Sequence, residues 1–177
     1  MPPTGDSLGE RVHASYLLLS AVASDLNSVS DELGKSVTEL DSALKKLNLG
    51  ISVWVSMRGN DGLPEDTWYR NEDLGYAKIG GKWGIALRTV SGDYQYPEHE
   101  NVEEWLFNDA PRSLRLSAIG HVAELLDALS KEADETTKKL KAKLAEAQAV
   151  ATAVKEAAAD LANAENQAGK RPGGQKK

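Results

Sequence analysis

The stretch Leu74–Val90, with the sequence LGYAKIGGKWGIALRTV, decides the fold of this chain. Gly80 and Gly81 separate two apolar-rich runs, and a two-residue hairpin turn requires the positive φ angles that glycine adopts without strain. The second run alternates, which places four side chains on one face of a strand: Trp83, Ile85, Leu87 and Thr89. The stretch therefore predicts an antiparallel β-hairpin with arms over residues 74–79 and 82–90.

The segment 51–57 predicts a further strand of the same small sheet, because its side chains alternate with the period of two that is typical of strands. One face of that strand carries Ile51, Val53, Val55 and Met57. Trp54 points the other way, toward a face that either a helix covers or a partner binds. Residues 67–70 predict a short additional strand. We interpret residues 91–108 as an acidic loop with a short helix over residues 102–107.

An apolar residue at every seventh position, beginning at Val12, predicts a long first helix. The expected seam of this helix consists of Leu19, Leu26, Leu33, Leu40 and Leu47. Asp6 or Ser7 is the candidate N-cap, and Gly50 is expected to end the helix after Leu49. An apolar residue at every seventh position over several heptads is typical of helices that pair in a coiled coil.

A second long helix is predicted to open at Asp109-Ala110-Pro111, where an N-cap candidate precedes a proline that the first turn tolerates. Its expected seam consists of Ile119, Leu126, Leu140, Val154 and Leu161. From Ala142 onward the seam is rich in alanine, so a partner helix must approach closely there. Arg112 and Arg115 share one face of the first turns. An acidic partner and the acidic head of the same chain are both candidate targets, and we expect neutralisation of the head within the chain.

These patterns predict an α+β fold. Two long heptad-patterned helices, as a helical hairpin or a coiled coil, flank a small antiparallel β-meander head. The expected organisation is a disordered start (1–7), the first helix (8–49), a β-rich acidic head (50–110), the second helix (111–167) and a disordered basic tail (168–177). The tail is rich in glycine and basic residues and has too little apolar material to fold.

The net charge of the chain is concentrated in the head. The chain carries −6, and residues 49–111, with 5 basic and 11 acidic side chains, account for all of it. An acidic segment repels a phosphate backbone, so we do not expect nucleic-acid binding. The absence of cysteine excludes disulfides and thiolate chemistry and is compatible with the cytoplasm, the expected location. A membrane span needs a run of about 20 apolar residues, and the sequence contains no such run, so no span is expected.

No residue pattern predicts a catalytic, metal or cofactor site. His99 stands between Glu98 and Glu100, but adjacent side chains point apart and do not converge on one ion. Residues 60–66 contain acidic side chains and a glycine, yet lack the regular alternation of a calcium loop. The serines lack a nucleophile-elbow motif. We therefore expect no cofactor and favour a non-enzymatic role.

The aromatic residues indicate where a partner would bind. Nine of the ten lie between Trp54 and Phe107, in a head too small to bury all of them. Aromatic and arginine side chains are the usual anchors of protein interfaces. The first hypothesis is a scaffold or adaptor that binds a partner protein through six residues of the head: Trp54, Trp68, Tyr69, Arg70, Trp83 and Arg88.

Two other functions stay open. A self-assembling coiled coil is the second hypothesis, because the second helix is longer than the first and its extra length is unmatched within the chain. A homo-oligomer through the long helices would then be the functional form. A small-molecule binder or enzyme, with its site between the head and the helices, is the third hypothesis, and no motif supports it.

Overall fold

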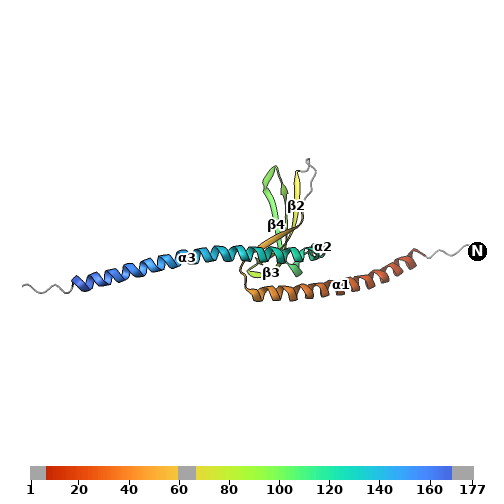
Figure 1. Ribbon diagram of the computed structural model, residues 1–177. Coiled ribbons are helices and arrows are strands. Elements are labelled where there is room, and N and C mark those ends of the chain that lie inside the picture. The colour runs from red at the N-terminus through yellow and green to blue at the C-terminus, as the bar shows by residue number, and fades with distance from the viewer. Residues whose placement is uncertain (1–6, 60–66, 169–177) are drawn as a thin grey trace, which may run out of the picture. The chain divides into compact units, whose positions relative to one another are not determined.

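The computed structural model describes residues 7–59 and 67–168. In chain order the elements are α1 (Leu8–Leu47), β1 (Val53–Arg58), β2 (Trp68–Ile79), β3 (Lys82–Asp93), β4 (Tyr96–Leu106), the 3-10 turn η1 (Phe107–Asp109), α2 (Arg112–Ala118), the 3-10 turn η2 (Ile119–His121) and α3 (Val122–Ala168) (Figure 1). A mixed fold with a four-stranded antiparallel sheet and long helices is therefore confirmed. Most of the predicted start, the acidic segment 60–66 and most of the predicted tail lie outside the described residues.

The chain divides into two compact units, one ending at Lys131 and the other beginning at Glu132. The first unit holds α1, the sheet, α2 and the opening of α3. The second unit is the remainder of α3, and none of its side chains between residues 132 and 165 is buried. The buried core of the described residues therefore belongs to the first unit.

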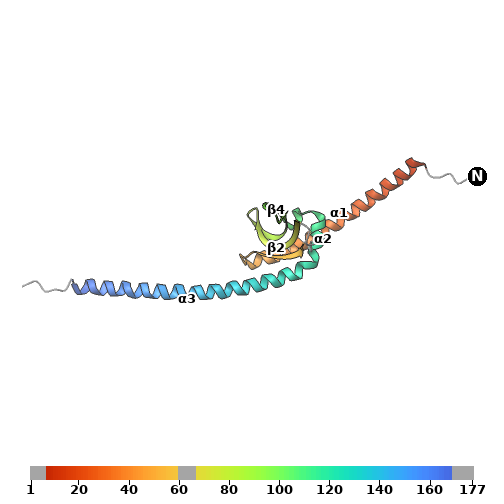
Figure 2. The same ribbon diagram turned by 90° about the horizontal axis from the view of Figure 1, so that it is seen from above.

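The sheet is a meander in the order β1-β2-β3-β4, with each strand antiparallel to the next. The predicted hairpin is confirmed, because β2 and β3 are joined at Gly80 and Gly81, whose φ angles are 55° and 85°. Across this hairpin Leu74 faces Leu87. Figure 2 shows the strands as a curved sheet.

The predicted acidic loop over residues 91–108, with a short helix over 102–107, is wrong. Residues 96–106 form β4, which pairs with β3 through partners such as Val102 and Val90, and η1 follows. β4 is an edge strand, and natural edge strands carry charged side chains that discourage pairing with other molecules. The glutamates that suggested a loop are therefore the mark of an exposed sheet edge.

The short strand predicted over residues 67–70 and the hairpin arm predicted over 74–79 belong to one strand, β2. The polar residues between them, Asn71–Asp73, concealed this continuity. Asp73 is compatible with a strand interior because Arg88 on the neighbouring strand β3 forms an ion pair with it. Polar side chains that satisfy one another across strands do not interrupt a sheet.

Helix α1 begins with a capping box at Ser7, one of the two candidate N-caps. The Ser7 hydroxyl accepts a hydrogen bond from the Glu10 N–H at 3.3 Å, and the Glu10 carboxylate accepts one from the Ser7 N–H at 2.7 Å. Both contacts satisfy donors that the first helical turn leaves free. The helix ends at Leu47, slightly before the predicted residue 49, because Asn48 adopts the left-handed conformation with φ 47°.

The single helix predicted over residues 111–167 is interrupted. Helix α2 ends at Ala118, the turn η2 follows, and then α3 begins, so the chain bends between the two helices (Figure 2). Gly120 within the turn is a poor helix former. Ala118 and Leu125 both have 0% exposure, so side chains from both sides of the bend reach the core. No helix within the described ranges has the length and apolar content needed to cross a bilayer.

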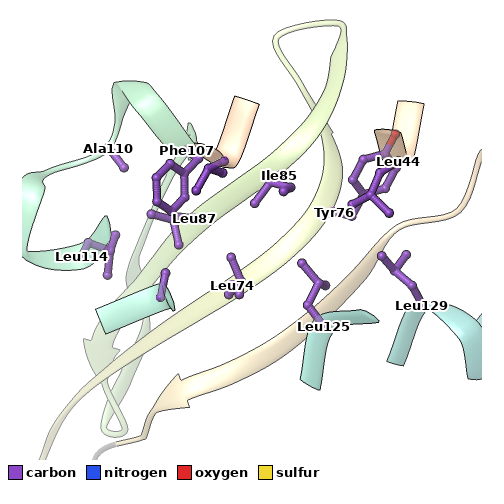
Figure 3. Packing of buried hydrophobic residues seen from close by; sticks show 12 residues of the cluster. Leu44, Leu74, Tyr76, Ile85, Leu87, Phe107, Ala110, Leu114, Leu125 and Leu129 are labelled. Atoms are coloured by element: carbon purple, nitrogen blue, oxygen red, sulfur yellow. The ribbon is translucent and has the colours of Figure 1, made fainter. Parts of the chain in front are cut away.

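One buried cluster lies against a single face of the sheet (Figure 3). The sheet contributes Leu74, Tyr76, Ile85 and Leu87, and the other elements contribute Val37, Leu44, Phe107, Ala110, Leu114, Ala118, Leu125 and Leu129. We call this side of the sheet the packed face, as defined by the four sheet residues. Burial of each large apolar side chain contributes about 1.5–3 kcal/mol to folding, so this face holds the first unit together.

Helix α1 lies where β4 leaves β3 unpaired. β4 ends at Leu106, whose partner on β3 is Ala86, so the backbone N–H of Ile85 lies beyond the reach of β4. The Asp41 carboxylate supplies the acceptor, with its Oδ1 atom 2.9 Å from the Ile85 nitrogen. Its Oδ2 atom lies 2.5 Å from the Lys45 ammonium nitrogen. A side chain of α1 thus continues the hydrogen bonding of the sheet.

Replacement of Asp41 by alanine is expected to lower the free energy of unfolding by about 1–3 kcal/mol, because the partly buried Ile85 N–H loses its acceptor. Asp41→Asn keeps an oxygen at this position and should cost less. Lys45→Ala is the matched control, since it removes only the ion pair, which contributes about 0.5 kcal/mol or less. Urea denaturation followed by circular dichroism measures all three. Equal losses in D41A and K45A would show that the contact with Ile85 does not stabilise the fold.

Candidate interaction surfaces

The open face of the sheet is the side that contributes no side chain to the buried cluster. It is defined here by Trp54, Tyr69, Asp73, Arg88, Val102 and Glu104, which alternate with the packed residues along the four strands. The predicted orientation of Trp54, opposite to that of Val53 and Val55, is confirmed by the strand register and by the exclusion of Trp54 from the cluster. This face is the first candidate surface.

Trp54 lies against the backbone of β2 at Gly75, its direct partner in the strand register. A Cβ atom on Gly75 would lie 2.3 Å from Cε3 of the tryptophan and 2.7 Å from the Val53 carbonyl oxygen, so no side chain fits there. The Arg88 guanidinium carbon is 4.3 Å from the centroid of the tryptophan ring. An arginine at this distance gains a cation–π interaction of about 0.5–2 kcal/mol. The ring is therefore held from two sides.

Arg88 is fixed on its other side by Asp73, its cross-strand partner. The Arg88 Nε and Nη2 atoms both donate to Asp73 Oδ2, at 3.0 Å and 2.8 Å. The side chains retain 27% and 12% of their exposure, so the pair is partly removed from water. Charge-assisted hydrogen bonds of this kind are stronger than neutral ones, which makes Trp54, Arg88 and Asp73 one ordered group.

A second aromatic–glycine pair lies farther along the same face. Tyr69 covers Gly92, where a Cβ atom would lie 2.6 Å from the phenol oxygen. The phenol donates a hydrogen bond of 2.6 Å to Glu100, and the Tyr94 ring lies 4.8 Å away between centroids. The hydrogen bond to Glu100 raises the pKa of Tyr69 above its ordinary value of 10.0, with smaller contributions from lost hydration and from the carboxylate charge. The phenol therefore stays a donor at neutral pH.

The six predicted partner-binding residues do not form one patch. Trp54, Tyr69 and Arg88 lie together on the open face, whereas Trp68, Arg70 and Trp83 alternate onto the opposite side. Trp83 stacks on Tyr76 at 5.7 Å and packs against the buried cluster. Trp68 is 61% exposed, and Arg70 forms an ion pair with Glu72 at 3.3 Å.

The predicted seam residues are also divided between environments. Leu33 and Leu40 of α1 are half-buried, and Leu40 packs against the core. The residues of α1 that enter the core are Val37 and Leu44 instead. The remaining predicted positions are exposed: Leu19, Leu26, Leu47, Ile119, Leu126, Leu140, Val154 and Leu161. Most of the predicted seam is thus surface in this chain.

The second candidate surface is the N-terminal half of α1. Its large apolar side chains keep between 48% and 77% of their exposure: Leu8, Val12, Tyr16, Leu17, Leu18, Leu19, Val22, Leu26 and Val29. A folded protein seldom leaves so much contiguous apolar surface to water, and such patches mark interaction sites. The side chains of α1 become buried only from Gly34 onward.

Arg112 and Arg115 of α2 bind α1 rather than the acidic head, so the expected neutralisation of the head is wrong. Arg112 Nη2 donates to the Asn27 side chain at 2.9 Å, and Arg115 Nη2 donates to the Ser30 hydroxyl at 3.3 Å. The Nε atom of Arg115 is buried and has no hydrogen-bond partner. Within the described residues, neither guanidinium forms an ion pair with a carboxylate.

Two pockets bear on the small-molecule hypothesis. One of about 350 Å³ lies between the end of α1 and the β2–β3 hairpin, and its walls include Lys45, Lys82, Tyr76 and Trp83. Burial raises the pKa of Tyr76 above 10.0, helped by the charge of Asp41 and opposed by that of Lys45. Another of about 580 Å³ borders α1 and is lined by polar side chains such as Thr38 and Asn108. Neither contains a nucleophile paired with a base.

The histidines do not form a metal centre. Within residues 7–59 and 67–168, no three histidine or carboxylate side chains converge closely enough to hold an ion. The His99 ring stacks on Tyr96 at 5.8 Å, and His121 lies 3.0 Å from the Glu124 carboxylate. The candidate calcium loop at residues 60–66 lies outside the described residues.

Sequence reasoning missed the residues that organise the open face. The alternation pattern predicts no role for Gly75 and Gly84, and the turn of that stretch is formed by Gly80 and Gly81. Gly75 makes room for Trp54 instead, and Gly84 lies beneath α1, where a Cβ atom would meet the Asp41 carboxylate at 3.2 Å. A glycine within a strand is a known sign of close approach by another group, and this was the available signal.

Gly75→Ala is expected to lower the free energy of unfolding by about 2 kcal/mol or more, because the added methyl group meets both the Trp54 ring and a backbone carbonyl. Gly120→Ala is the matched control: nothing lies within 4 Å of its Cβ position, so the change should stay within about 0.5 kcal/mol. Thermal unfolding followed by circular dichroism compares them. Similar stability of G75A and G120A would contradict the close contact between Trp54 and Gly75.

No model of a protein family, no curated protein and no solved structure matches this chain.

Proposed function

We propose that this chain is a non-enzymatic interaction module, a scaffold or adaptor that binds a partner protein through the open face of its sheet. The observation that carries the proposal is the ordered group of Trp54, Arg88 and Asp73 on a face that contributes nothing to the buried cluster. Tryptophan and arginine dominate the binding energy of many protein interfaces. Anchors that are already ordered lose little conformational entropy on binding.

The charges of this face define the partner. Asp73 neutralises Arg88, which leaves Glu104, the strand partner of Arg88, and Glu100 as net negative charges. Val102, 48% exposed, adds apolar area between them. The surface thus suits a polypeptide that presents apolar side chains flanked by lysine or arginine, because complementary charge speeds association and selects the partner.

A protein fits this face better than a small molecule does. The pockets described above are lined by other residues, and neither includes Trp54 or Arg88. Small ligands bind in concave sites that cover most of their surface, whereas protein partners use broad faces with a few anchors. A ligand or substrate between head and helices has no such support from the side chains. The cytoplasmic location expected from the sequence stays a prediction.

Val102→Glu is expected to weaken binding of the partner at least tenfold, because it replaces the exposed apolar side chain between Glu100 and Glu104 with a charged one. Val102 is exposed, so the fold should be unchanged. The matched control is Val150→Glu, which adds the same charge at an exposed position of α3. Partners are first captured from a cell lysate and identified, and each is then titrated with the purified variants. Equal affinity of V102E, V150E and the unchanged chain for every captured protein would exclude the open face as the binding site.

Self-assembly through the long helices is the second candidate function. The apolar N-terminal half of α1 favours it, as do the exposed seam residues of α3 from Leu140 to Leu161. Heptad spacing of apolar residues on exposed helices is typical of coiled coils. A light-scattering mass equal to that of a monomer at high micromolar concentration would exclude this function.

A further inference from the structure

We infer that residues 8–33 of α1 pair in antiparallel orientation with the same segment of a second copy of this chain. The inference rests on the second candidate function and names its surface, partner and direction. It starts from the contrast within α1: the helix enters the core with Gly34, Val37 and Leu44, while the apolar side chains before them remain exposed. A helix of similar length with an apolar stripe would cover that first half.

Heptad positions show that the segment is complementary to itself. Taking Val12 as position a, the a positions are Val12, Leu19, Leu26 and Leu33, and the d positions are Leu8, Ser15, Val22 and Val29. In an antiparallel pair, a residues of one helix pack in layers with d residues of the other. The layers are Leu8 with Leu33, Val12 with Val29, Ser15 with Leu26, and Leu19 with Val22. All of them share one two-fold axis between residues 20 and 21, so the pairing closes on itself as an isologous dimer.

Charge complementarity selects this direction. Arg11 and Glu32 occupy g positions, and antiparallel helices place the g positions of the two chains side by side. Arg11 of each copy then faces Glu32 of the other. Both residues are exposed, and neither forms an ion pair among the described residues. A parallel pair would set Arg11 beside Tyr16 and Glu32 beside Val37, and would leave both charges unpaired.

The flank formed by α2 fits the same arrangement. On that side Ser30, which accepts the hydrogen bond of Arg115, would face Gly9 of the second copy. Gly9 has no side chain to collide with α2 or with Arg112 and Arg115, which reach α1 there. These two guanidinium groups lack a carboxylate partner within the described part of their own chain. Leu26, Val29 and Leu116 line the hollow beside them, so the groove offers apolar contact together with positive charge.

Analytical ultracentrifugation of the full chain tests the pairing. The unchanged chain should dimerise. Arg11→Glu and Glu32→Arg should each weaken dimerisation by about tenfold, because two exposed ion pairs become repulsive. The double variant R11E/E32R should recover most of the affinity. Lys35→Glu is the matched control, since it makes the same change in charge at an exposed position of α1 outside the pairing seam, and it should dimerise like the unchanged chain.

Disulfide formation tests the direction, since the chain has no cysteine of its own. A mixture of Val12→Cys and Val29→Cys chains should cross-link between the two variants, and V12C alone should not. Cross-linking of V12C with itself would overturn the antiparallel direction. If R11E and Leu19→Asp both dimerise with unchanged affinity, α1 is not the dimer surface, and self-assembly through another helix remains possible. A monomer at all concentrations would overturn both, without bearing on the open face of the sheet.

Discussion

The docking of the second half of α1 against the sheet is the interaction on which the arrangement of the first unit depends, through Val37 and Leu44 in the buried cluster and through the hydrogen bond from the Ile85 N–H to the Asp41 carboxylate. This hydrogen bond closes the stretch of β3 that β4 does not reach, and it fixes α1 beside that stretch. The turn after β4 is tied to the same helix, since Asn108 donates to the Thr38 hydroxyl at 3.0 Å. The second half of α1 packs against the sheet, whereas its first half extends past the sheet and remains exposed.

The two faces of the sheet are stabilised by different interactions. The packed face is buried against the helices, and its residues are large and apolar. Around Trp54 and Tyr69 the open face is ordered by rings that lie over glycines and by an ion pair between neighbouring strands. Cross-strand pairs of this kind stabilise a sheet locally. A surface organised in this way holds its polar and aromatic groups in fixed positions, with Trp54, Tyr69 and Arg88 half-buried and Asp73 buried.

The sequence was informative where local chemistry is decisive and misleading where tertiary contacts override it. The hairpin at Gly80-Gly81 and the direction of Trp54 follow from backbone geometry and alternation, and both are confirmed. β4 was missed because it is an edge strand that pairs only with β3, and exposed glutamates on an edge strand do not destabilise a sheet. The break after Ala118 was missed because it depends on which side chains reach the core on either side of a turn.

The candidate surfaces were predictable to a similar degree. An excess of aromatic residues indicated the head, but only the strand register separates Trp54, Tyr69 and Arg88 from Trp68 and Trp83. Heptad spacing identified an apolar stripe on the first helix. Which half of that stripe is exposed depends on where the helix meets the sheet, and no spacing rule contains that information.

Helix α1 runs unbroken for 40 residues, which corresponds to about 60 Å, and its anchor at Asp41 lies close to its C-terminal end. A continuous helix is stiff on this scale, so a sideways load applied near Leu8 acts with a moment arm of about 30 Å on the first contacts that α1 makes with α2, at Asn27 and Ser30. The element that offers apolar surface is therefore also a lever. A partner that binds the N-terminal end of α1 can therefore transmit force to the first unit.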